Sequence, residues 1–195
     1  MSISSPFTRL QELLPQLFQE PELKGTPYLR FSINNGQQSA LIPMKNVKES
    51  LSVSSEKITP IPSLPSFVMG LMSSRDSVFL AIDLGQFIGL SPLSSYLRQY
   101  NVMVLDLSSE IETFESSFNN LLIGFAVSGI QGINRLMPEQ IVEGKSIPQE
   151  FPPVTTDLPE MTKQYFSSSV KGKERELMIL DLPKISSVLG AKTAF

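Results

Sequence analysis

Apolar and polar residues alternate along much of the chain with the period of two that is typical of β-strands. The first such stretch, Tyr28–Ile33, is followed by Asn34-Asn35-Gly36, a sequence that favours a tight hairpin turn. The segment Ser39–Met44 supplies the return strand. The pattern therefore predicts a β-hairpin at the start of the domain.

More short strands are predicted downstream, because prolines between Pro43 and Pro92 break this half of the chain into pieces too short for long helices. One pair of apolar runs, ending at Gly70 and starting at Val78, flanks a polar turn that carries Arg75. The other predicted strands are Val47–Val53, Val102–Leu107, Leu121–Val127, Ile130–Met137, Met161–Val170 and Glu174–Leu180, the last two forming a hairpin around Lys171-Gly172-Lys173.

Two short helices are predicted where a strand runs into an Asp-Leu pair. Asp83–Leu90 and Asp181–Leu189 both begin with an aspartate that can accept hydrogen bonds as a helix N-cap. The repetition of this strand, Asp-Leu and helix pattern suggests two similar lobes. With nine or ten closely spaced strands, we expect a mainly β, barrel-like fold.

Residues 1–25 differ from the rest and predict an N-terminal helical arm. Their apolar residues have helical spacing, and Ser5-Pro6 could begin the helix. Pro15 would bend it, so we favour an arm that packs on its own domain, with a docking helix for a partner as the alternative. The expected organisation is arm 1–25, domain 26–190 and tail 191–195. The apolar residues are Phe7, Leu10, Leu13, Leu14, Leu17 and Phe18.

Composition narrows the function classes. The 195 residues are 41% hydrophobic and 18% charged, a globular balance, with a net charge of −3. No basic excess points to nucleic acid or to an anionic membrane, and no apolar run is long enough to span a bilayer. We expect a cytoplasmic protein without nucleic acid or membrane insertion.

The chain contains no histidine, cysteine or tryptophan. This excludes Cys/His zinc sites, Ser-His-Asp and Cys-His catalysis, and disulfide bonds. A carboxylate-bound metal or an acidic catalytic pair stays open, because Asp83, Asp106 and Asp181 follow strands and two of them could converge. A β-barrel that binds a small ligand in an apolar pocket is a further alternative. The acidic stretch holding Glu110, Glu112 and Glu115 lacks the spacing of a calcium loop and is expected to be a solvated hairpin tip.

The order of these parts resembles the CheW-like domain family of bacterial chemotaxis over about residues 28–190. The resemblance is carried by the opening hairpin, a Val-x-Glu step at Val47 and Glu49, a central Pro-rich block, and two later strands. The central block matches at Pro60-Ile61-Pro62, Pro65, Val68, Gly70-Leu71, Arg75, Val78 and Asp83-Leu84. The later strands match at Ile123-Gly124-Phe125-Ala126-Val127 and Ile179-Leu180-Asp181-Leu182.

This resemblance implies two packed five-stranded β-barrels and an adaptor that is not an enzyme and uses no cofactor or metal. The implied partners are a CheA-type histidine kinase and the cytoplasmic tip of a methyl-accepting chemoreceptor. The chain departs from the family at three positions, where Asp76 replaces a glycine, Ala81 a proline and Ser128 an aspartate.

The expected partner-binding residues are Arg75, Val47, Glu49 and Asp76. Arg75 could pair with acidic groups of a partner, or it could pair with Asp76 or Asp83 and hold its own turn. Val47 and Glu49 could contact the receptor or simply lie on a strand edge. Asp83 and Asp181 are expected to cap helices, and Met69, Met72 and Met103 to fill the core.

Overall fold

A computed structural model describes residues 24–108, 121–143, 160–170 and 177–193 of the chain. The strands are β1 (Thr26–Ile33), β2 (Gln38–Pro43), β3 (Val47–Ser54), β4 (Val68–Ser74), β5 (Ser77–Asp83), β6 (Gln99–Asp106), β7 (Leu122–Val127), β8 (Gly129–Leu136), β9 (Ile141–Glu143), β10 (Phe166–Val170) and β11 (Leu177–Leu180). The α-helices are α2 (Leu84–Phe87), α3 (Glu160–Lys163) and α4 (Leu182–Thr193), and short 3₁₀ turns lie at η1 (Met44–Asn46), η2 (Ser55–Lys57) and η4 (Pro138–Gln140).

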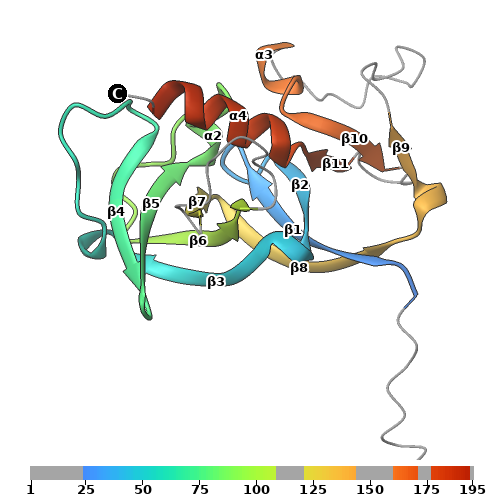
Figure 1. The fold of residues 1–195 in the computed structure, drawn as a ribbon, viewed down its shortest axis with the longest axis horizontal. Helices are drawn as coiled ribbons and strands as arrows, with labels where there is room; N and C mark the ends of the chain where they lie inside the picture. The colour runs from blue at the N-terminus through green and yellow to red at the C-terminus, as the bar shows by residue number, and fades with distance from the viewer. Residues whose placement is uncertain (1–23, 109–120, 144–159, 171–176, 194–195) are drawn as a thin grey trace, which may run out of the picture.

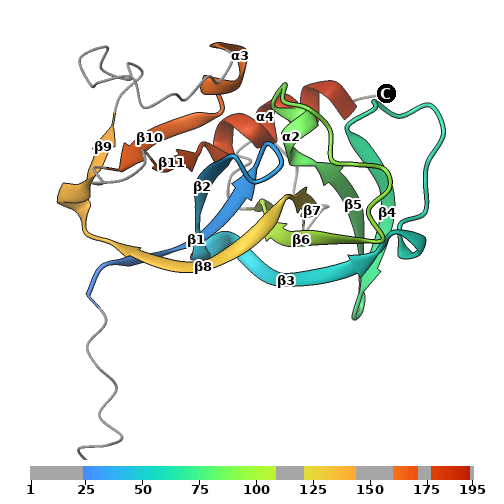
Figure 2. The same cartoon turned by 180° about the vertical axis from the view of Figure 1, so that it is seen from behind.

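The described strands form two sheets that lie side by side, with α4 running across them (Figure 1). The six-stranded sheet has the order β8-β1-β2-β11-β10-β9, and the five-stranded sheet has the order β3-β6-β7-β5-β4. The view from behind shows the same division (Figure 2). The mainly β, two-lobed architecture is as expected. One sheet has six strands rather than five, because the three-residue strand β9 pairs with β10.

Each sheet contains one parallel pair among otherwise antiparallel neighbours. Strand β11 runs parallel to β2, and β5 runs parallel to β7. Both β5 and β11 lead directly into a helix, α2 and α4 respectively. The two lobes are therefore built around the same local unit, as the repeated Asp-Leu pattern suggested.

The aspartates at these two junctions cap the helices. The Asp83 carboxylate accepts a hydrogen bond from the Gln86 backbone N–H at 3.1 Å, and Asp181 accepts one from Lys184 at 2.9 Å. These bonds satisfy backbone donors that have no partner within a helix. The leucines that follow, Leu84 and Leu182, are both buried.

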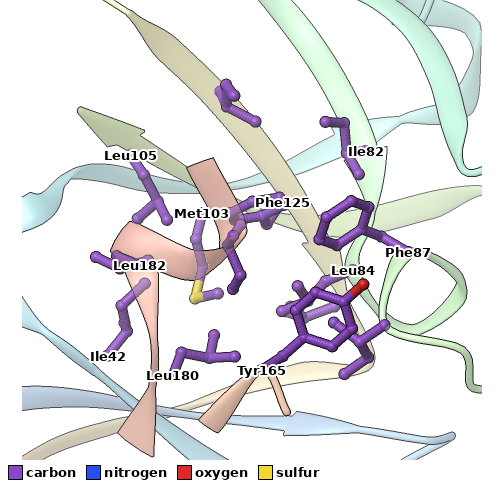
Figure 3. Packing of buried hydrophobic residues seen from close by; sticks show 14 of the residues in the cluster. Ile42, Ile82, Leu84, Phe87, Met103, Leu105, Phe125, Tyr165, Leu180 and Leu182 are labelled. Carbon is purple, nitrogen blue, oxygen red and sulfur yellow. The ribbon is translucent and has the colours of Figure 1, made fainter. Parts of the chain in front are cut away.

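Alternating side chains divide the buried residues into three clusters. A central core lies between the two sheets and under α4, and it includes Met103, Phe125, Leu84 and Leu182 (Figure 3). A second cluster fills the other face of the five-stranded sheet, and a third, which includes Leu41, lies on the other face of the six-stranded sheet. Strands β6 and β7 are covered on both faces, which explains their nearly continuous apolar sequences.

The methionines that were expected in the core lie there. Met103 belongs to the central core and Met72 to the second cluster, against which the partly buried Met69 packs.

The hairpin β1–β2 is as the sequence predicted. Asn34 and Asn35 have φ angles of 51° and 54°, and Gly36 has 85°. Asparagine and glycine adopt this left-handed region more readily than other residues.

The segment Met161–Val170 was predicted to be one strand, and this is wrong for its first part. Helix α3 occupies residues 160–163, and β10 begins only at Phe166. The turn between them is closed by the Tyr165 N–H, which donates to the Thr162 carbonyl at 3.1 Å. Thr162 in this turn is fully buried.

Helix α4 continues to Thr193, into the segment that was expected to be a tail. The predicted arm up to residue 23, the acidic stretch with Glu110, Glu112 and Glu115, and the turn at 171–173 lie outside the described residues.

Candidate partner-binding site

Arg75 lies at the tip of the β4–β5 hairpin, which projects past β3 (Figures 1 and 2). Ser74 pairs with Ser77, so Arg75 and Asp76 form a two-residue turn. Arg75 takes a φ of 50°, and its side chain is 83% exposed. The turn therefore presents the guanidinium to solvent, at a backbone conformation that is unusual for an arginine.

The structure brings Arg75 together with Glu49. The Arg75 Nε lies 3.6 Å from Glu49 Oε2, and the Glu49 side chain is only 18% exposed. The partner of Arg75 is thus neither Asp76 nor Asp83. Since β3 and β4 are the two edge strands of the five-stranded sheet, this ion pair links the hairpin beside one edge to the strand at the other.

Val47 and Glu49 are separated by an irregularity in the β3–β6 pairing. Val47 lies opposite Leu105 and Glu49 opposite Val104, with Lys48 in the bulge between them. Val47 packs against the central core, whereas Leu51 and Val53, further along β3, pack in the second cluster. A bulge re-aims side chains in this way and gives neighbouring residues different surroundings.

Lys48 forms a second ion pair, which the sequence reasoning missed. Its Nζ lies 3.0 Å from Asp106 Oδ2 at the end of β6. Burial would raise the pKa of the Asp106 carboxyl, but hydrogen bonds from Ser108 and Lys48 outweigh it and hold the pKa below its usual value. Only the pairing of β3 with β6 shows that these two residues meet.

Asp76 is exposed beside Arg75, and within the described part of the chain its carboxylate makes no ion pair or hydrogen bond. Its charge is available to a partner. The same hairpin also exposes apolar surface, since Val78 is 69% and Leu71 38% exposed. In the sequence Val78 was noted as the start of a strand and as a match to the family pattern, and its place close to the polar turn was the signal for its exposure.

The three aspartates that could have formed a catalytic or metal site have separate structural partners. Asp83 and Asp181 cap different helices, and Asp106 pairs with Lys48. Asp83 also accepts a 2.7 Å hydrogen bond from the Leu93 N–H. Burial raises the pKa of Asp83, although three backbone N–H groups act to lower it. Among the described residues, no group of three acidic side chains is placed to hold a metal ion.

A cavity of about 310 Å³ lies where β2 and β11 diverge, near the start of α4. Its lining includes Tyr28, Pro43, Lys45 and Asp181. This volume is at the lower limit for a small-molecule site. The cavity is built from other residues than the Arg75 hairpin.

No helix in the described part of the chain is long and apolar enough to cross a membrane.

A family model and a solved structure that resemble this chain both belong to CheW-like proteins. Residues 27–189 match the model of the CheW-like domain. The fold is similar to the crystal structure of the scaffolding protein TtCheW from Thermoanaerobacter tengcongensis, with a TM-score of 0.59 and 15% sequence identity over 81% of this chain and 90% of that chain. No curated protein matches.

Proposed function

The chain belongs to the CheW-like domain family, and from this membership we propose that it is an adaptor that couples methyl-accepting chemoreceptors to a CheA-type histidine kinase in chemotaxis or pilus-driven motility. Family membership supports a scaffolding role in chemotaxis signalling. In this proposal the protein works in the cytoplasm, where the receptor tips and the kinase meet, and contributes binding surfaces rather than a catalytic group.

The observation that carries the proposal is the ion pair between Glu49 and the exposed Arg75. The two residues occupy positions where the family pattern has an arginine and a glutamate, and 83% of the Arg75 side chain is accessible. An arginine keeps donors free while it contacts one carboxylate, so a partner's acidic or carbonyl groups can add to the pair. Val78 and Leu71 supply exposed apolar area on the same hairpin, and Asp76 adds an exposed charge next to Arg75.

Charge reversal at Arg75 tests the proposal. We expect Arg75→Glu to weaken assembly with a CheA-type kinase and a receptor tip by about tenfold or more, because the variant opposes Glu49 and repels the acidic groups that Arg75 would attract. The fold should persist, since the side chain is exposed and a surface ion pair contributes about 1 kcal/mol or less. Assembly is measured by co-sedimentation of the ternary complex and by kinase autophosphorylation.

Arg98→Glu is the matched control, because Arg98 is also exposed but lies in the loop before β6. This variant should assemble like the unchanged protein. Normal assembly of Arg75→Glu would remove this hairpin from the proposed interface. Failure of the unchanged protein to bind either partner would refute the adaptor role itself.

A further inference from the structure

A second arginine, Arg30, lies on a different surface and takes part in neither of the ion pairs found among the described residues. In β1 its neighbours Leu29 and Phe31 point into the central core, so Arg30 points to the opposite face of the six-stranded sheet. Ser39 on β2 and Gln131 on β8 are polar neighbours on this face. The Ser39 hydroxyl lies 3.5 Å from Arg30 Nη2 and donates to Gln131 Oε1 at 2.9 Å.

The guanidinium of Arg30 makes few hydrogen bonds with the described residues. Its Nε is buried without a hydrogen-bond partner, and neither ion pair of the described residues involves it. Its hydrogen bond with Ser39 is long and is made with a neutral group. A partly buried guanidinium without a carboxylate is costly, and it is the kind of group that binds an incoming carboxylate with two parallel hydrogen bonds.

Strand β8, which pairs with β1, has a glycine beside Arg30 and so places no side chain there. Gly132 on β8 is the register partner of Arg30, and apart from its chain neighbours Gln131 and Ile133 no described residue has an atom within 4 Å of the place where a side chain would begin at Gly132. Beyond Gly132 lies a sheet edge, because β8 pairs only with β1 among the described strands. An extended segment added there would place one residue in line with Gly132 and Arg30, about 10 Å from Arg30 in the sheet.

Side chains in this sheet already meet across an intervening strand. Gln131, the extra residue at a register shift in the β1–β8 pairing, reaches from β8 over β1 to Ser39 on β2. An arginine and a glutamate can therefore meet over Gly132, which has no side chain. On the other face, Ile133 is 60% exposed and offers an apolar contact for a neighbouring residue of the same segment.

We propose that the free edge of β8 binds an extended acidic segment of a partner protein, which adds to the six-stranded sheet as a further strand and places a carboxylate on Arg30. Main-chain hydrogen bonds would supply affinity, and the carboxylate would fix the register. A second copy of this chain does not fit through the same edge, because the sequence of β8, GIQGINRL, contains no acidic residue.

A random decapeptide library selected on the full-length protein tests this inference. We expect selected peptides to share one glutamate or aspartate within a run of β-branched or aromatic residues. Replacing that acid with its amide should weaken binding of the isolated peptide by about tenfold or more, as should Arg30→Gln. When the amide peptide is tested against Arg30→Gln, the affinity should fall little further than with either change alone, because the acid and Arg30 interact with each other.

Two further measurements locate the site. Arg30→Lys keeps the charge but not the planar fork, so it should lose less affinity than Arg30→Gln, and Arg98→Gln should bind normally. Bound peptide should slow amide hydrogen exchange at residues 129–136. Peptides without an acid, less than a twofold effect of Arg30→Gln in a folded variant, or protection elsewhere would each overturn the proposal. None of these outcomes bears on the kinase and receptor contacts.

Discussion

Gly70 shows how one residue can fix the position of a loop. It has a φ of 146°, and a side-chain carbon there would lie 2.2 Å from the Thr59 carbonyl oxygen. The absence of that carbon lets Thr59 form a bridge with Leu71, through N–H···O hydrogen bonds of 2.8 Å in both directions. This bridge fastens the proline-rich segment before β4 to the hairpin that carries Arg75.

We expect Gly70→Ala to lower the free energy of unfolding by about 2–4 kcal/mol, because the new methyl group collides with backbone that cannot move independently. Gly132→Ala is the matched comparison, since Gly132 has a φ of 120° but open space around it. It should cost about 1–2 kcal/mol from backbone strain alone. Urea denaturation measures both, and equal losses would show that the approach of Thr59 is not the cause.

Single residues of the site were predictable where their chemistry is distinctive. Arg75 could be selected from the sequence as a lone cation in a polar turn, and Glu49 from its match to the family pattern. Their mutual contact could not, because it depends on how the five-stranded sheet curls. The pair between Lys48 and Asp106 was hidden for the same reason, since Lys48 lies in a bulge of β3 and Asp106 at the end of β6, far along the chain.

At the scale of elements, the two Asp-Leu junctions look alike in sequence but differ in their contacts. Asp83 uses one carboxylate oxygen to cap α2 and the other to hold the loop at Leu93. Asp181 caps α4, and the hydrogen bond that its carboxylate accepts from the Lys184 N–H is exposed. Only at Asp83 are both oxygens needed as acceptors in a buried setting.

Replacement of each aspartate by asparagine separates these roles. Asparagine caps helices about as well as aspartate, so Asp181→Asn should change stability by less than about 0.5 kcal/mol. Asp83→Asn would turn an amide NH₂ toward the Leu93 N–H and leave that buried donor without an acceptor, at a cost of about 1–3 kcal/mol. Thermal and urea denaturation of the two variants give the comparison. Similar effects would mean that the loop contact contributes little.

Element type was predictable where burial on both faces or strict alternation marks a strand. The runs that became β6 and β7, the opening hairpin and both capped helices illustrate this. Strand β9 was missed because three residues carry no detectable period, and it exists only by pairing with β10. Helix α3 was missed because four residues are too few to show a helical period.

At the scale of the whole molecule, the pairing of distant strands completes each lobe. The six-stranded sheet joins β1 and β2 from the start of the domain to β10 and β11 from its end. The two-lobed class could be inferred from strand spacing and the repeated Asp-Leu unit. The parallel pairs between β2 and β11 and between β5 and β7 could not, because local sequence does not state which strands become neighbours.

The sheets and the three buried clusters of the described residues use residues from β1 onward, which starts at Thr26. This leads to a prediction for the segment that precedes β1. A chain that lacks residues 1–24 should fold and unfold in a single cooperative transition, with a stability within about 1 kcal/mol of the full chain. Urea titrations followed by circular dichroism would test this. Aggregation or a clearly lower midpoint would assign the N-terminal segment a structural role instead.

The central core receives Leu84 from one lobe and Leu182 from the other, so neither sheet can separate without exposing apolar area that the other needs (Figure 3). Relative rotation of the lobes is therefore opposed by the same packing that stabilises each of them. Proteins bound at Arg75 and at the edge of β8 would be held at a constant distance and angle, so a shift of one bound protein would be transmitted to the other as through a rigid spacer.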